Sequence, residues 1–172
     1  MPLTIRQEHS QDYQAVYQIN KQAFAQEAEA KLVDALRKSD VFVPELSLVA
    51  ELDNQIVGHI LFTKIQIVNG NNSYESVALA PMAVLQDYQK KGIGGELIRE
   101  GLQRAKELGF SSVIVLGHEH YYPKFGFEPA AKWNIKAPFD VPSKVFRAIE
   151  LVPNGLQHVS GTVQYPKEFE SV

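Results

Sequence analysis

Residues 76–108 read SVALAPMAVLQDYQKKGIGGELIREGLQRAKEL and place a strand, a glycine-rich turn and the start of a helix in immediate succession. The apolar run from Val77 to Leu85 has the length of a buried strand, and helical periodicity begins just after Gly92. The first N–H groups of a helix have no carbonyl partner, and the helix dipole adds partial positive charge there. Because glycines let several N–H groups converge on one anion, this turn is predicted to bind phosphate.

The surroundings of the turn bear on the kind of phosphate ligand. The following helix has a well-formed apolar face, made by Ile93, Leu97, Ile98, Gly101, Leu102, Ala105 and Leu108. Lys90 and Lys91 put two positive charges beside the turn, which suits a diphosphate. The nucleotide-binding patterns G-x-G-x-x-G and G-x-x-x-x-G-K-[ST] do not occur here. A plain glycine turn without a ligand is the alternative.

Pro81 interrupts the apolar strand, and a proline inside a strand removes one hydrogen-bond donor from the ladder. Such a residue marks a sheet edge, a bulge or the point at which pairing stops. If pairing stops there, Met82 to Val84 keep free backbone groups just before the turn, and an extended ligand carrying amides could bond to them as a strand would. A ligand with a diphosphate at one end and two amides in its arm is coenzyme A (CoA).

Two segments, 79–98 and 121–127, resemble the signatures of a known enzyme family. The first, LAPMAVLQDYQKKGIGGELI, is similar to the acetyl-CoA motif [QR]-x-x-G-x-[GA] of the Gcn5-related N-acetyltransferases. The second, YYPKFGF, resembles that family's tyrosine four residues before a Gly-Phe pair. Two signatures in this order are much more specific than either alone. With the ending YPKEF at 165–169, the sequence resembles a bacterial subgroup of uncharacterised predicted acetyltransferases.

The resemblance implies an α/β fold (α+β in some schemes) with a mixed central sheet in the order β-α-α-β-β-β-α-β-α, followed by C-terminal strands. The residue patterns predict strands at 3–6, 46–52, 56–68, 77–85 and 111–116, and helices at 11–24, 27–38 and 93–108. A short last helix is expected at 117–122, and further strands near 133–136, 145–151 and 159–164. The chain is predicted to form one domain, residues 1–172, with 132–172 as its strand-rich C-terminal part.

The resemblance further implies an enzyme that moves an acetyl group from acetyl-CoA to a primary amine by direct attack on the thioester. In that family the tyrosine before the Gly-Phe pair often protonates the departing thiolate, which places this role on Tyr122. The base is left open between His118, whose imidazole exchanges protons near neutral pH, and Glu119. The expected cofactor-binding residues are Met82, Ala83, Val84, Gln89, Lys90, Lys91, Gly92, Ile93, Gly94, Gly95 and Phe125.

Two other functions fit parts of the same pattern. A non-catalytic acyl-CoA-binding sensor or regulatory module would need the cofactor turn but no base. A nucleotide-binding module would need one of the missing glycine fingerprints. A metal site at His118, Glu119 and His120 is disfavoured because the two rings of an H-x-H pair on a helix point to different sides. No metal is therefore predicted.

Side chains outside the two signatures carry weaker expectations. His59 in the second hairpin strand is expected to be a packed, structural residue rather than a catalyst. Glu27 and Glu29 could face the acceptor pocket, but the preferred interpretation is solvated charges on a helix. Gly101 costs the long helix on the order of 1 kcal/mol relative to alanine, which predicts a close approach of helix and sheet.

The composition is that of an ordinary soluble protein, with 22% charged residues and a formal net charge of 17 − 20 = −3. No basic block is present, so nucleic-acid binding is not expected, and no window resembles a membrane span or a signal peptide. The absence of cysteine excludes disulfides and thiolate catalysis. A cytoplasmic monomer or homodimer is expected. The charge permits a cationic amine acceptor but does not select a small molecule, a peptide N-terminus or a lysine.

Overall fold

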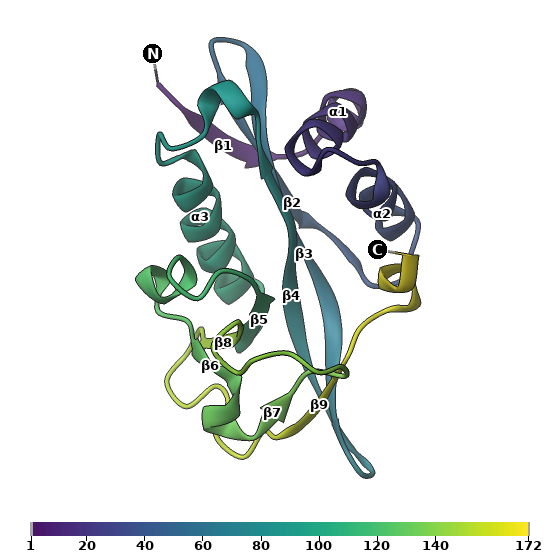
Figure 1. Cartoon of the computed structure of the whole chain (residues 1–172), viewed down its shortest axis with the longest axis vertical. Coiled ribbons are helices and arrows are strands. Elements are labelled where there is room, and N and C mark those ends of the chain that lie inside the picture. Colours follow the sequence, from purple (N-terminus) through teal and green to yellow (C-terminus); the bar gives the residue numbers. More distant parts are fainter. Residues whose placement is uncertain (1, 172) are drawn as a thin grey trace.

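One mixed sheet of nine strands organises the described part of the chain, residues 2–171, in the computed structural model (Figure 1). The strands are β1 (Thr4–Gln7), β2 (Phe42–Leu52), β3 (Gln55–Asn69), β4 (Asn72–Val84), β5 (Ser112–Leu116), β6 (Glu128–Pro129), β7 (Ile135–Lys136), β8 (Phe146–Glu150) and β9 (Gly161–Gln164). Their order is β1-β2-β3-β4-β5-β8-β6, with β9 paired to β3 and β7 paired to β9. Strands from both ends of the chain therefore share one sheet.

Helices cover both faces of this sheet (Figure 1). The α-helices of the described chain are α1 (Tyr13–Phe24), α2 (Ala28–Arg37) and α3 (Ile93–Glu107). Short 3₁₀ helices are η1 (Ser10–Asp12), η2 (Gln86–Tyr88), η3 (Tyr122–Phe125), η4 (Ala130–Trp133) and η5 (Lys167–Ser171). Helix α3 lies on one face, and α1 and α2 lie on the other. Within residues 2–171, no helix has the length and apolarity needed to cross a membrane.

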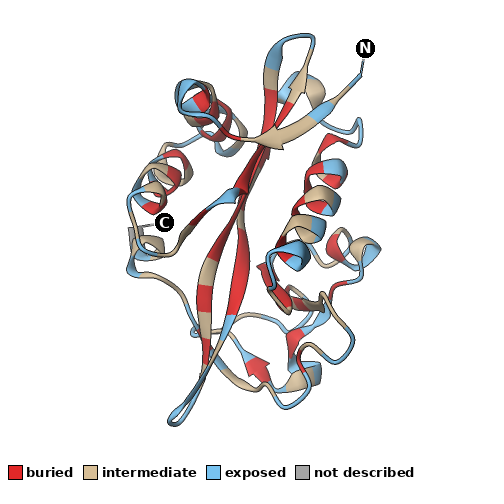
Figure 2. Ribbon diagram, turned by 180° about the vertical axis from the view of Figure 1, so that it is seen from behind, coloured by how far each residue is buried: buried red, intermediate tan, exposed pale blue. Residues whose placement is uncertain are grey.

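Strand β3 is buried on both faces, which explains its near-continuous apolar run. Because successive side chains of a strand point to opposite faces, neighbours along β3 enter different cores. Ile60 and Phe62 belong to the cluster that contains Leu97 of α3. Leu61 instead joins the cluster that contains Leu32 of α2. Figure 2 shows the resulting burial along the central strands.

Strands β4 and β5 pair in parallel over a short stretch and then separate. The paired positions are Val77 with Val113 and Ala78 with Ile114. On its other side, β4 stays paired with β3 as far as Val84, with a register shift where Ala80 and Pro81 face Leu61. Of the three possibilities expected at Pro81, the structure shows a bulge, since pairing with β3 continues beyond it. The edge of β4 beyond Ala78 has no β5 partner in the described chain.

Most expected elements are present with small shifts at their ends, but the region after β5 differs. Residues 119–121 form a turn, and the expected helix at 117–122 is replaced by the single 3₁₀ turn of η3. Pro123 has no N–H to donate to an α-helical ladder, and Gly126, with a φ of +99°, ends the segment in the left-handed region. The earlier part of the predicted order agrees with the structure, from β1 to β5.

Gly101 of α3 packs directly against β3, as the sequence predicts. A Cβ at this position would lie 2.2 Å from Cε1 of Phe62. We expect Gly101→Ala to lower the free energy of unfolding by about 1–3 kcal/mol, although alanine is the better helix former by about 1 kcal/mol. Urea denaturation measures the change. In a Phe62→Leu background the same substitution should lower the free energy of unfolding by less. Equal decreases in both backgrounds would contradict the steric explanation.

His59 of β3 lies in a buried polar cluster that joins the first residues to α1 and α2. Its Nε2 is 3.1 Å from Oγ of Ser47, and that hydroxyl donates to Oε1 of Glu8 at 2.9 Å. The Nε2–H group therefore donates to Ser47, and Nδ1 faces the Asn20 amide at 3.5 Å. Glu8 is in turn paired with Arg37. The cluster holds His59 as a neutral ring.

The burial of His59 predicts acid sensitivity. Desolvation, with a smaller contribution from the Arg37 cation, lowers the pKa of His59 from 6.5 to about 3. Between these values the unfolded chain binds a proton that the folded chain does not, so stability present above pH 6.5 is lost as pH falls toward 3. We expect the unfolding free energy to fall by about 1.4 kcal/mol per pH unit between pH 6.5 and 5. Urea titrations at several pH values measure the slope.

Two histidine variants separate this effect from general acid denaturation. His59→Gln should remove most of the pH dependence between pH 6.5 and 5, whatever its own stability. His158→Gln, at an exposed position, should keep it. An unchanged slope in His59→Gln would show that another group binds the proton on unfolding.

Candidate active site

A cavity of about 1170 Å³ opens where β4 and β5 separate. One wall is the β4 edge, one end is the turn before α3, and another part is formed by the segment after β5. Its lining includes Ala78, Leu79, Ala80, Pro81, Met82, Ala83, Val84, Gln89, Lys90, Gly92, Ile93, Gly94, Gly95, His118, Tyr121 and Tyr122. The cavity is large enough to hold an organic ligand of cofactor size. The two sequence signatures therefore meet at one cavity.

The N-terminus of α3 presents unpaired backbone N–H groups at one end of the cavity. The first helical hydrogen bond runs from the Glu96 N–H to the Gly92 carbonyl at 3.1 Å. The N–H groups of Ile93, Gly94 and Gly95 precede that bond and have no helical partner. Together with the helix dipole, three such donors form an anion-binding site. Phosphate binding by this turn stays a prediction.

The Gln89 side chain ties the turn to the end of β4. Its Nε2 donates to the carbonyl oxygen of Val84 at 2.9 Å. Lys90 follows with a φ of +63°, and Gly92 has a φ of +85°. Positive φ is the conformation that glycine adopts without steric cost, so the turn needs Gly92 and holds Lys90 in an uncommon state. The Lys90 side chain is exposed and lines the cavity.

The open edge of β4 offers backbone groups to the cavity at every second residue. The Leu85 N–H bonds to the Val57 carbonyl at 2.9 Å, on the β3 side. Because backbone groups of successive strand residues point to alternate sides, those of Met82 and Val84 point toward the cavity. Ala83 directs its carbonyl to β3 and contributes its side chain to the lining. Met82 and Val84 can therefore bond to an extended ligand.

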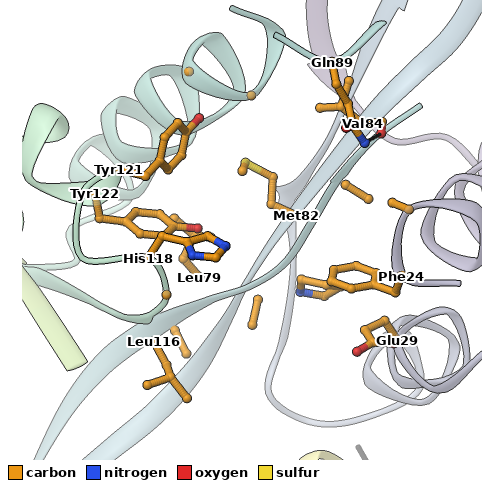
Figure 3. A pocket seen from close by; sticks show the side chains of 18 of the residues that line it. Phe24, Glu29, Leu79, Met82, Val84, Gln89, Leu116, His118, Tyr121 and Tyr122 are labelled. Carbon is orange, nitrogen blue, oxygen red and sulfur yellow. Dashed lines mark hydrogen bonds between the residues drawn. The ribbon is translucent and has the colours of Figure 1, made fainter. Parts of the chain in front are cut away.

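Tyr122 of η3 is a buried phenol whose hydroxyl points into the cavity beside His118 (Figure 3). Its ring is 8% exposed and packs edge-to-face against Tyr121 and Phe127, with centroids 5.2 and 5.6 Å away. Burial raises the pKa of Tyr122 to about 12, so the hydroxyl keeps its proton at neutral pH. Gly117 makes room for the ring, since a Cβ there would lie 2.3 Å from Cε2 of Tyr122.

Tyr121 and Lys124 also line the cavity, although neither was predicted as a catalytic or cofactor-binding residue. A Cβ at Gly94 would lie 3.1 Å from the Tyr121 hydroxyl oxygen, which puts this hydroxyl at the start of α3. The Lys124 Nζ lies 4.5 Å from the centre of the Tyr121 ring. Both residues belong to the YYPKFGF signature. Besides Tyr122, this signature therefore contributes residues to the end of the cavity at the start of α3.

Lys91 and Phe125, both expected to bind the cofactor, are not among the residues that line the cavity. The Lys91 Nζ lies over the Tyr88 ring at 5.5 Å from its centre. The Phe125 ring lies 3.5 Å from a Cβ built at Gly95 and stacks under the Arg99 guanidinium at 5.1 Å. Phe125 thus packs on the first turn of α3. Both residues lie next to residues of the lining, and their part in cofactor binding stays a prediction.

His118 and Glu119, the two candidate bases, lie in different surroundings. His118 lines the cavity (Figure 3). Glu119 does not, and its carboxylate lies 3.4 Å from the Lys144 Nζ and 3.7 Å from the His120 Nε2. Within residues 2–171, no group of three or more His, Cys, Asp or Glu side chains is arranged to hold a metal ion. His118 is therefore the better placed base.

The remaining wall of the cavity comes from α1, α2 and the C-terminal third of the chain. It consists of Phe24, Glu29, Leu32, Phe139, Tyr165 and Phe169. The half-buried side chain of Glu29 points into the cavity (Figure 3), and the hydrogen bonds of its carboxylate to Gln26 remain exposed to solvent. Glu27 does behave as a surface charge and lies 3.4 Å from Lys21 and 3.5 Å from Lys31.

Comparison with known proteins agrees with this geometry. The sequence profile of the Acetyltransferase (GNAT) family matches residues 13–127. The chain is 39% identical over 134 residues to the uncharacterized N-acetyltransferase YjhQ of Escherichia coli K12, covering 77% of this chain and 74% of YjhQ. It is 32% identical over 168 residues to the uncharacterized N-acetyltransferase YhbS of the same strain, covering 97% and 98%.

Solved structures show that the similarity includes the three-dimensional fold. The crystal structure of E. coli YhbS in complex with CoA superposes with a TM-score of 0.90 at 30% identity, covering 98% of this chain and 92% of that one. A GNAT acetyltransferase from Brucella melitensis in complex with acetyl-CoA gives a TM-score of 0.79 at 33% identity, covering 98% of both chains. With its family profile, near-full-length relatives and shared fold, this chain belongs to the GNAT family of N-acetyltransferases.

Proposed function

We propose that this enzyme transfers an acetyl group from acetyl-CoA to a primary amine by direct attack of the amine on the thioester. One observation carries the proposal: a single cavity connects the unpaired N–H groups of α3 with the protonated hydroxyl of Tyr122 along the open edge of β4. Relatives that share the fold at 30% and 33% identity bind CoA and acetyl-CoA. We also propose that the whole chain is one catalytic domain, since β1 and β9 belong to one sheet.

The cofactor would lie along the β4 edge. Its diphosphate would accept hydrogen bonds from the N–H groups of Ile93, Gly94 and Gly95, with Lys90 as the nearby cation. The two amides of its arm would pair with the backbone of Met82 and Val84 in the manner of an added strand. The thioester would then lie beyond Met82, on the side of Tyr122 and His118 (Figure 3).

The chemical step requires two proton transfers. The neutral amine forms a C–N bond to the thioester carbonyl carbon, and its nitrogen loses one proton, which His118 accepts directly or through water. Backbone N–H groups at the β4 edge stabilise the negative charge that develops on the carbonyl oxygen. The C–S bond then breaks, and the departing thiolate takes the Tyr122 proton. Tyr122 is placed for this role because its protonated hydroxyl points into the cavity beside His118 (Figure 3).

A thiol-release assay with a panel of amines tests the proposed function. Purified protein is incubated with acetyl-CoA and each amine, free thiol is followed by colour development, and the acetylated product is identified by mass spectrometry. We expect thiol release that depends on both an amine and the enzyme. Tight CoA binding without release for any amine would instead favour a non-catalytic acyl-CoA sensor, and binding of ATP in place of CoA would overturn the cofactor assignment.

A further inference from the structure

Four aromatic residues outside the two sequence signatures line the cavity. The Phe139 and Tyr165 rings stack with centroids 6.3 Å apart, and the Tyr165 and Phe169 rings follow at 5.2 Å. Phe24 lines the same region from the end of α1. The Phe139 side chain is 48% exposed although it faces this cavity, so a ligand that covered it would bury apolar surface. We refer to Phe24, Glu29, Leu32, Phe139, Tyr165 and Phe169 as the acceptor wall.

Glu29 is the one carboxylate among the residues that line the cavity in the described chain. Both of its oxygens accept from the Gln26 amide, at 2.9 and 3.1 Å, but residues 2–171 offer it no Lys, Arg or His within 4.0 Å. Glu27, two residues earlier, differs in being paired with two lysines and in lying outside the lining. Glu29 thus keeps its negative charge available to a ligand.

The positive charges of the cavity come from other segments than the acceptor wall. Lys90 belongs to the phosphate turn, and the Lys124 Nζ lies 4.5 Å from the ring of Tyr121, whose hydroxyl is next to Gly94. The acceptor wall itself contains no Lys or Arg. A ligand at this wall meets one negative charge surrounded by aromatic surface. This charge pattern disfavours a carboxylate on the acceptor, and a single Glu leaves additional ammonium groups unpaired.

We propose that the acceptor is a small primary amine with one positive charge on an aromatic or flat apolar body, and that Glu29 selects it. This inference rests on the proposed function. The body lies against Phe139 and Tyr165, and Glu29 attracts the ammonium form. The ammonium then gives one proton to bulk water through the open cavity, and the neutral amine moves to the thioester and attacks. Amino acids are disfavoured by their carboxylate, and polyamines by their additional charges. Glu29 is therefore a specificity-determining residue of the acceptor wall.

Initial rates with three amines and two matched variants test the proposal. The probes are 2-phenylethylamine, phenylalanine, which adds a carboxylate, and spermidine, which adds charges and lacks the ring. We expect kcat/KM for 2-phenylethylamine to exceed the others by about 10-fold or more. Glu29→Gln should raise KM for 2-phenylethylamine by about 10-fold, because a charge-assisted bond becomes a neutral one, while the Kd for CoA stays unchanged. Glu27→Gln should change neither quantity.

The outcomes separate this inference from the proposed function. Preference for phenylalanine or spermidine, or an unchanged KM in Glu29→Gln, would overturn the inference while leaving acetyl transfer intact. If no amine releases thiol, the proposed function fails, and calorimetric titration of 2-phenylethylamine into the CoA-bound protein still decides the binding claim. Binding that weakens in Glu29→Gln but not in Glu27→Gln would support it, and absence of binding would refute it.

Discussion

Gly94→Val is expected to abolish CoA binding, with a rise in Kd of about 100-fold or more. A Cβ at Gly94 would already lie 3.1 Å from the Tyr121 hydroxyl and 3.5 Å from Cε of Met82. The two valine methyl groups would occupy the space in front of the α3 N–H groups that a phosphate oxygen needs. Isothermal titration calorimetry with CoA measures the loss.

A valine on the same helix provides the control for Gly94→Val. Gln103 is exposed on α3 and lies outside the cavity lining. Gln103→Val brings the same β-branched side chain into the helix and should leave CoA affinity unchanged. Thermal unfolding followed by circular dichroism checks that both variants fold. If Gly94→Val folds and binds CoA as tightly as the parent, the phosphates lie elsewhere and the cofactor assignment is wrong.

Tyr122→Phe is expected to lower kcat by about 100-fold or more while leaving the Kd for CoA unchanged. The substitution removes only the hydroxyl, and the ring still packs on Tyr121 and Phe127. Without the hydroxyl, the CoA thiolate must leave unprotonated or take a proton from water. Because burial raises the pKa of Tyr122 to about 12, the parent enzyme should not lose this donor up to about pH 10. Steady-state rates with saturating amine measure both effects.

Tyr74→Phe is the matched control for the loss of a phenolic hydroxyl. Tyr74 is a partly buried tyrosine of β4 that packs against the cluster containing Ile65, outside the cavity lining. The kcat of Tyr74→Phe should stay within about 2-fold of that of the parent enzyme, because the substitution lies in a cluster that does not line the cavity. A full kcat in Tyr122→Phe would discard the proton-donor role, whereas equal losses in both variants would point to a general effect on the fold.

Much of the fold was predictable because its signals are local. The strand, turn and helix of residues 76–108 are specified by apolar periodicity, by glycine at a positive-φ position and by a proline at the register shift of β4. Gly101 is unfavourable in a helix, which predicted a close approach of helix and sheet, and Phe62 is the residue it contacts. The helix expected at 117–122 was wrong because Pro123 and Gly126 limit the segment to one 3₁₀ turn.

The sequence by itself predicted the backbone turn at one end of the cavity, because such a turn needs particular residue types at consecutive positions. Only the tertiary structure decided the acceptor wall. Glu29, Phe139 and Tyr165 come from three distant segments, and no spacing in the sequence shows that they share one cavity. The structure likewise separated Lys90, which lines the cavity, from Lys91, which lies over Tyr88. Short-range patterns encode backbone conformation, whereas the walls of a cavity depend on which side chains the packing of sheet and helices brings together.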